Sequence, residues 1–296
     1  MFRGCYFEYA GQYSGDYNLM LYYIDDSMDK FDSGGKYDLI ADTLPSTAES
    51  LLYGLKYSEN PLEFSIEIIN PDGAISMEQM RKIKTWLFGQ DCWKKLILKD
   101  EDYSKYYLLC LLVPDSDITD VTGYRGIRCQ VKNISPFWYG ETKTKTITYD
   151  EMKGHLTSGL NYEFDINIDT DTPLSVPAVI KFTDPGAYTP QVAPNDDREF
   201  WVKNQTNNSL LHRFMNEKSF WHLGETWSFD TRLLQFESLN SGVITNYIPL
   251  STTNEIFYLQ RGLNHISVAC HDIYDEELYF KDFSISYTPC YRIGGF

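Results

Sequence analysis

The chain has 296 residues, enough for one large or two ordinary domains, and carries 26 Lys and Arg against 42 Asp and Glu, a formal net charge of −16. A surface this acidic repels phosphate backbones, which argues against specific nucleic-acid binding. Aromatic residues make up 16% of the chain, with 23 Tyr and 17 Phe. Because Tyr and Phe favour pleated, half-buried surfaces, the composition predicts a β-rich protein with a solvated, acidic exterior.

The opening of the chain carries no targeting signal. Residues Met1–Cys5 lead directly into polar and aromatic residues, without the apolar core of a signal peptide. No stretch approaches the ~20 apolar residues that a membrane helix requires. We therefore expect synthesis in a cytoplasm and no membrane partner. In that reducing setting the six cysteines, none of them in a Cys-x-x-Cys pair, are expected to be structural thiols.

The first half of the chain alternates strand-like runs with turns. Residues 1–25 are predicted to form a strand, a polar turn and a second strand, and residues 25–50 to be loop-like. Residues 51–69 are predicted to hold two strands, because Leu62–Ile68 alternates apolar and polar side chains. Further strands are predicted at Lys94–Leu98, Tyr106–Val113 and Arg125–Asn133, with a hairpin-like link between the first two.

The clearest helix is predicted at Met77–Phe88. Ser76 followed by Gln79 forms a capping box, and Gly89 suits the residue just past the helix end. Apolar residues then recur on one face of the helix, namely Met80, Ile83 and Leu87, with Trp86 beside them. We interpret this helix as the cover of one sheet face.

The second half of the chain has short strands separated by turn signals about every ten residues, a rhythm typical of a β-sandwich. Strands are predicted at 142–148, 162–168, 178–182, 210–214, 226–229, 233–237, 256–259, 265–270 and 278–287. Arg261–Asn264 is predicted to be a tight turn. The domain boundary is placed so that residues 1–140 form the first domain and residues 141–296 the second.

A search for catalytic, cofactor and metal motifs leads to no assigned residue. The run Asp165-Ile166-Asn167-Ile168-Asp169-Thr170-Asp171 opens like an EF-hand loop, but Thr170 stands where that loop needs Gly and Val176 where it needs Glu. Its period-two alternation favours a strand with one solvated face, and a weak cation site stays open as the alternative. His265 and His271 lie six residues apart, and metal binding there would need a third ligand placed by the fold.

Taken in order, these elements resemble the distal tail protein (Dit) family of siphophages over nearly the whole chain. Phe7–Gly11 and Tyr17–Leu21 look like that family's first hairpin, and Met80–Leu87, ending in Trp-Leu, looks like its helix. Gly224–Asp230 and Leu259–Ile266 look like its C-terminal sandwich. The order and spacing of these pieces, rather than one motif, carry the resemblance.

The resemblance implies a mainly β protein with two domains. The α+β N-terminal domain, a β-sandwich or open barrel with one helix and a hairpin, would form a hexameric ring where the tail tube meets the tail tip. A galectin-like C-terminal β-sandwich would decorate the outside of the ring. The implied partners are the major tail tube protein and the tail-tip hub or tail-associated protein, with receptor-binding proteins at the periphery in some phages, and DNA would pass through the ring.

Other functions compete with this structural role in the virion. A carbohydrate-binding or receptor-binding accessory module of the tail tip would need an exposed aromatic platform on the second domain. An enzyme such as a wall hydrolase would need convergent titratable residues in a cleft. The sugar-binding motifs of galectins are absent, since His222-Leu223-Gly224-Glu225 does not match and no His-x-Asn-Pro-Arg string exists. A galectin-like fold therefore does not by itself imply sugar binding.

Overall fold

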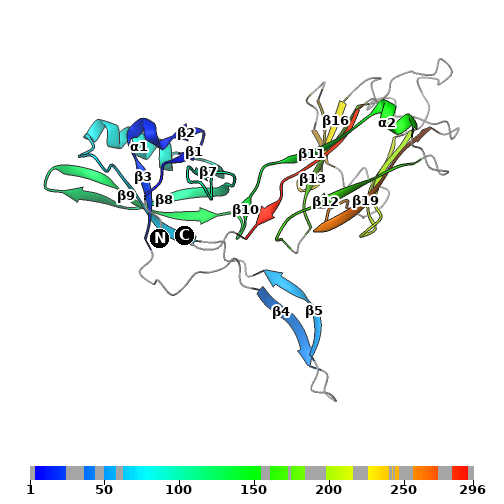
Figure 1. Cartoon of the computed structure of the whole chain (residues 1–296), viewed down its shortest axis with the longest axis horizontal. Coiled ribbons are helices and arrows are strands. Elements are labelled where there is room, and N and C mark those ends of the chain that lie inside the picture. Colours follow the sequence, from blue (N-terminus) through cyan, green and yellow to red (C-terminus); the bar gives the residue numbers. More distant parts are fainter. Residues whose placement is uncertain are drawn as a thin grey trace. The chain divides into compact units, whose positions relative to one another are not determined.

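The computed structural model describes residues 4–24, 37–43, 50–57, 63–154, 161–172, 175–183, 198–215, 226–239, 242, 244–246, 256–272 and 282–292. The chain divides into two compact units. Unit 1 comprises Met1–Glu141 and Cys290–Phe296, and unit 2 comprises Thr142–Pro289. Strands make up most of both units (Figure 1), so the predicted mainly β fold class is confirmed.

Unit 1 is organised around one antiparallel sheet of seven strands in the order β2-β1-β7-β8-β9-β6-β3. These strands are β1 (Phe7–Tyr9), β2 (Gln12–Tyr13), β3 (Met20–Ile24), β6 (Glu63–Ile69), β7 (Lys94–Leu98), β8 (Leu108–Asp120) and β9 (Gly123–Asn133). A short 3-10 helix, η1 (Ser14–Tyr17), connects β2 with β3. The alternating pattern that predicted β6 is explained by its place between β9 and β3, where Ile66 and Ile68 are buried.

Two further strand pairs belong to unit 1. β10 (Trp138–Tyr139) pairs with β21 (Cys290–Tyr291), which follows unit 2 in the sequence. β4 (Tyr37–Thr43) pairs with β5 (Ser50–Tyr57) in an antiparallel hairpin. The prediction of a loop across residues 25–50 is therefore wrong for β4. Turn residues on both sides of this segment dominated the sequence pattern, whereas the strand depends on pairing with β5.

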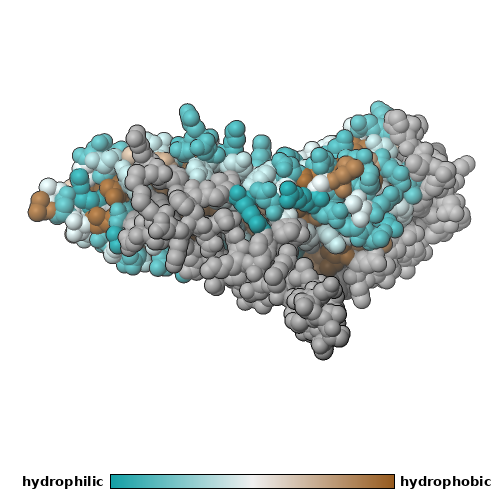
Figure 2. Space-filling model, turned by 60° about the horizontal axis from the view of Figure 1, so that its bottom comes forward, coloured by the Kyte–Doolittle hydropathy of each residue, from teal (hydrophilic) through white to brown (hydrophobic). Residues whose placement is uncertain are grey.

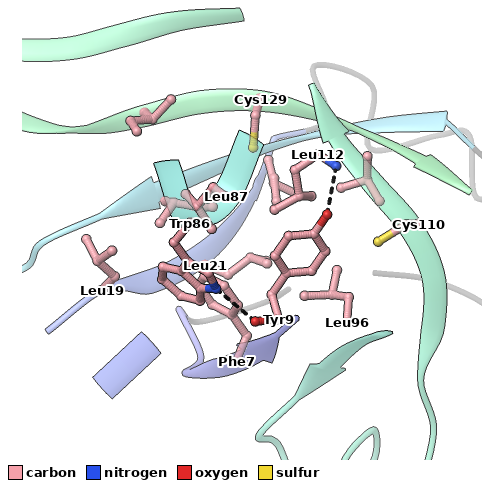
Figure 3. Packing of buried hydrophobic residues seen from close by; sticks show 14 of the residues in the cluster. Phe7, Tyr9, Leu19, Leu21, Trp86, Leu87, Leu96, Cys110, Leu112 and Cys129 are labelled. Atoms are coloured by element: carbon pink, nitrogen blue, oxygen red, sulfur yellow. Dashed lines mark hydrogen bonds between the residues drawn. The ribbon is translucent and has the colours of Figure 1, made fainter. Parts of the chain in front are cut away.

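The helix α1 (Met77–Phe88) is confirmed with its capping box. The Ser76 hydroxyl accepts from the Gln79 backbone N–H, and the Gln79 side chain accepts from the Ser76 N–H, both at 3.3 Å. The apolar face of α1 packs on this sheet, and its buried residues share one hydrophobic core with residues of the strands, including β1 and β3 (Figure 3). The helix thus covers one sheet face, as the sequence predicted.

Unit 2 is built from two antiparallel sheets. The first has the order β11-β20-β13-β16-β17-β18, with β11 (Lys143–Thr148), β20 (Asp282–Tyr287), β13 (Ala178–Thr183), β16 (Thr226–Asp230), β17 (Gln235–Ser238) and β18 (Ile244–Asn246). The second has the order β12-β19-β14-β15, with β12 (Tyr162–Ile168), β19 (Gly262–Asp272), β14 (Arg198–Asn204) and β15 (Ser209–Met215). Side chains from both sheets share one hydrophobic core. A short helix, α2 (Tyr149–Gly154), was not predicted.

The segment before β19 differs from the prediction. Residues 256–259 were expected to form a strand, but they make only an isolated bridge between Leu259 and Val176. Side chains take the place of a strand partner here, since the Tyr258 carbonyl accepts from Asn204 and Ser209. The prediction of a tight turn over residues 261–264 is also wrong, because β19 already begins at Gly262. Gly262 does have a positive φ of +86°, which suits a turn.

Candidate interaction surfaces

The indole of Trp86 fixes α1 to the sheet of unit 1. Its Nε1–H donates to the backbone carbonyl of Tyr9 at 2.8 Å (Figure 3). The Trp86 ring also stacks between Phe7 and Tyr17, with ring centroids 5.8 and 5.3 Å away. Phe7 lies in the core, whereas Tyr17 is half-buried at the end of η1. The aromatic stack therefore leads from the core of unit 1 to its surface.

Tyr9, whose carbonyl accepts from Trp86, also forms a hydrogen bond towards the middle of the sheet. Its hydroxyl accepts from the Leu112 backbone N–H at 3.4 Å, so β1 is tied to β8 across the intervening β7 (Figure 3). Burial, with the nearby Cys110 thiol, raises the pKa of Tyr9 well above its ordinary value of 10.0. The phenol therefore stays neutral, as a hydrogen-bonding group inside an apolar core requires.

A surface pocket of about 370 Å³ lies beside this stack. It is lined by Gln12, Tyr17, Arg81, Lys82, Thr85, Trp86 and Gln90. No sequence pattern predicted this grouping, because α1 is distant in sequence from β2 and η1 and meets them through the aromatic stack. Its volume falls within the range of small-ligand or side-chain sites.

The β8–β9 hairpin forms a second surface of unit 1. β7 pairs only with the first residues of β8, up to Cys110, so among the described strands none pairs with the outer edge of β8 from Leu111 to Asp120. Register shifts at Pro114/Ser116 and at Ile118/Thr119 interrupt this edge. Such irregularities and exposed acidic side chains restrict which strands can pair with an open edge.

The end of this hairpin is held in a defined shape. Asp117 forms an ion pair with Lys84 of α1 at 2.7 Å, and Arg125 pairs with Asp120 at 3.1 Å. The Thr122 hydroxyl donates to the Asp120 carboxylate, as does the Thr122 backbone N–H, and these two hydrogen bonds lower the pKa of Asp120. Val121 stands fully exposed at the turn, with 104% of its reference area accessible.

The outer face of the β12-β19-β14-β15 sheet is the polar surface of unit 2. The Asp165 carboxylate lies 2.6 Å from His265 Nδ1, on directly paired residues of β12 and β19. Asn167 is exposed on the same face, whereas Ile166 and Ile168 are buried. The first part of the EF-hand-like run, residues 165–168, is therefore a strand with one solvated face, as predicted, whereas residues 169–171 lie past the end of β12. Among the described strands β12 is an edge strand of its sheet.

The metal, cysteine and membrane expectations can be compared with the described residues only. Within them no group of three or more His, Cys, Asp and Glu is arranged to hold a metal ion, and His155 and His222 lie outside them. Five cysteines are free, and burial raises the pKa of Cys129 to about 12. No helix in the described part is long and apolar enough to span a membrane. On the face drawn in Figure 2, hydrophobic side chains form small separate patches among hydrophilic ones.

Comparisons with known proteins agree with this architecture. Residues 2–135 match a family described as the phage tail protein N-terminal domain. The crystal structure of the distal tail protein of phage SPP1 matches with a TM-score of 0.57 at 12% identity, covering 96% of this chain and 98% of that one. The chain has the distal tail protein fold. The predicted resemblance to the distal tail protein family is thereby confirmed.

A chain of the phage P2 baseplate in its activated conformation with calcium is also similar in fold to this chain. It matches with a TM-score of 0.53 at 7% identity, covering 97% of this chain and 98% of that one. No curated protein sequence gives a significant match. The likeness to both phage structures extends over both units of this chain, whereas the family match is confined to unit 1.

Proposed function

We propose that the chain is a non-enzymatic structural protein of a phage virion, a subunit of the ring that joins the tail tube to the tail tip or baseplate. The likeness in fold over 96% of the chain to the SPP1 distal tail protein carries the proposal. That protein is described as a paradigm of the hub adsorption apparatus in phages infecting Gram-positive bacteria. The match of residues 2–135 to a phage tail protein domain supports it independently.

Unit 1 supplies the contacts between neighbouring subunits in this proposal. A closed ring needs heterologous contacts, in which one surface of a subunit meets a different surface of the next. The open outer edge of β8 and the ordered β8–β9 tip provide one such surface, and exposed residues of α1 outside the pocket, such as Met77 and Glu78, provide a different one. Bulges and acids along β8 favour a specific partner strand over indiscriminate pairing. We propose a hexamer.

Unit 2 decorates the outside of the ring as a galectin-like sandwich. The ring would contact the major tail tube protein on one side and the tail-tip hub or tail-associated protein on the other, with receptor-binding proteins at its periphery. DNA would pass through the lumen without being bound, since a net charge of −16 disfavours contact with phosphates. The protein would thus lie at the distal end of the tail after synthesis in the host cytoplasm.

Electron microscopy of the purified full-length protein tests the ring directly. We expect closed rings with a central hole as wide as a tail tube, and a mass in solution six times the 34.4 kDa of one chain. Co-expression with the neighbouring tail tube and hub proteins extends the test to assembly that needs those partners. A protein that stays monomeric alone and in their presence would overturn the ring proposal.

Carbohydrate or receptor binding by unit 2 is the second candidate function. The observation in its favour is the outer face of the β12-β19-β14-β15 sheet, where the partly exposed Trp201 shares a face with Lys203 and His265. An indole beside polar groups can stack on a sugar ring and bond its hydroxyls. A glycan array with the full-length protein and W201A distinguishes the two functions, because only a sugar-binding module would lose signal in the variant.

A further inference from the structure

The pocket beside α1 has an aromatic wall and a polar rim, and the half-buried Tyr17 offers most of the aromatic surface because Trp86 beneath it is only 4% exposed. Trp86 and Tyr17 stack at 5.3 Å with only 20° between their planes, and both line the pocket. Gln12 and Gln90 contribute amide groups, and Arg81, Lys82 and Thr85 of α1 complete the lining. A ligand here meets an apolar surface on one side and hydrogen-bonding groups on the other.

Two groups on the rim, the Gln12 amide and the Arg81 guanidinium, have hydrogen-bond donors without an acceptor within the described chain, whereas the Gln90 amide already donates to the Trp86 carbonyl at 2.6 Å. The Gln12 carbonyl already accepts from the Tyr17 hydroxyl, so its amide N–H groups are left to donate. The Thr85 hydroxyl donates to the Arg81 backbone carbonyl at 2.9 Å. The Arg81 guanidinium adds the five donors of that group in a planar fork. The complementary ligand therefore carries acceptors.

The charge of the pocket contrasts with that of the whole chain. None of the seven lining residues is acidic, although acids outnumber bases by 42 to 26 in the sequence. Lys82 Nζ forms an ion pair with Glu78 Oε1 at 3.1 Å. Arg81 has no carboxylate within ion-pair distance among the described residues. Four other cations of unit 1 are paired with carboxylates, in the pairs Lys84–Asp117, Lys99–Glu8, Arg125–Asp120 and Arg128–Glu67. Lys95 and Lys105 are exposed without such a pair among the described residues, but neither lines the pocket.

We propose that this pocket is a docking site for an acidic segment of a neighbouring protein, in which a Glu or Asp side chain pairs with Arg81 beside an aromatic or apolar side chain packed on Tyr17 and Trp86. The planar guanidinium matches a carboxylate in two parallel hydrogen bonds. The Gln12 amide N–H groups suit a peptide carbonyl of such a segment. The site stands on its own geometry and does not depend on whether the chain closes into a ring.

Two blocked dipeptides that differ only in charge serve as probes, acetyl-phenylalanyl-glutamate amide and acetyl-phenylalanyl-glutamine amide. Each is titrated into isotope-labelled full-length protein while the side-chain amide signals of Gln12 and Gln90 and the indole N–H signal of Trp86 are followed by NMR. We expect saturable shifts with the glutamate probe and about tenfold weaker binding of the glutamine probe, the usual difference that a charge-assisted hydrogen bond makes.

Matched variants identify the residue responsible. R81Q should reduce binding of the glutamate probe to the level of the glutamine probe, whereas K105Q, which removes an exposed cation of unit 1 outside the pocket, should leave it unchanged. Thermal unfolding of R81Q checks that the variant is folded. Equal binding of both probes, full binding by R81Q, or tighter binding of inorganic phosphate than of the glutamate probe would overturn the proposal. Ring formation is read separately by electron microscopy.

Discussion

The indole N–H of Trp86 and the backbone carbonyl of Tyr9 lie 2.8 Å apart although 77 positions separate the two residues in sequence. This hydrogen bond joins α1 to β1 in a region where Trp86 is only 4% exposed. W86F keeps an aromatic ring in the stack but leaves the Tyr9 carbonyl without this donor. We expect a loss of about 1–3 kcal/mol in the free energy of unfolding, measured by urea titration.

W93F is the matched control for that measurement. Trp93 is 42% exposed, so its replacement should change stability by less than about 0.5 kcal/mol. Equal destabilisation by the two variants would contradict the role assigned to the Trp86–Tyr9 hydrogen bond.

The start of α1 gives a second prediction. S76A removes the side chain that accepts from the Gln79 N–H and should cost about 1 kcal/mol of stability. S104A is a suitable control, because Ser104 is exposed and contributes its backbone N–H, bonded to the Asp100 carbonyl, to the turn before β8. Adding Q79A to S76A should cost little more, since both halves of the capping box act on the same helix start. Additive costs would contradict this coupling.

Asn264 organises the segment that precedes β19. Its amide donates to the carbonyls of Gln260 and Gly262 at 2.8 and 2.9 Å, and its oxygen accepts from Asn204 at 2.8 Å. N264A should cost at least about 2 kcal/mol, because several buried polar groups lose their partners together. Hydrogen exchange of residues 256–260 should become faster as well. N167A on the exposed face of β12 should change neither quantity.

Buried thiols predict a decrease in stability at alkaline pH. Burial raises the pKa of both Cys5 and Cys129 from 9.0 to about 12. Below pH 9 the thiols are protonated in the folded and the unfolded chain alike, so their contribution is fully present. Between pH 9 and 12 only the unfolded chain releases these protons, which favours unfolding as the pH rises.

Urea titrations at pH 8 and pH 10 measure this effect. C129A should show a smaller loss of stability between the two pH values than the wild type. The exposed Cys92 provides the control, since C92A should keep the wild-type pH dependence. An identical pH dependence of C129A and the wild type would show that the Cys129 thiol does not carry the effect.

Local sequence patterns predicted the elements whose signals are local. The capping box located α1, and strict alternation located β6 and β12, because burial of one face imposes a period of two. β4 and the segment at residues 256–259 were mispredicted because their structure depends on partners distant in sequence. The pocket beside α1 was missed for the same reason: Gln12 and Arg81 come together only after Trp86 has packed on Phe7.

The pairing of β10 with β21 has a consequence for how this protein can evolve. Trp138 faces Tyr291 and Tyr139 faces Cys290, so the chain leaves unit 1 and returns to it through two adjacent strands. Residues 142–289 are therefore an insertion within unit 1, joined through two ends that lie side by side. An insertion of this kind can be enlarged, exchanged or replaced by a short turn while the seven-stranded sheet keeps all its strands. Unit 2 can thus vary in size or sequence without any change in the strand order of unit 1.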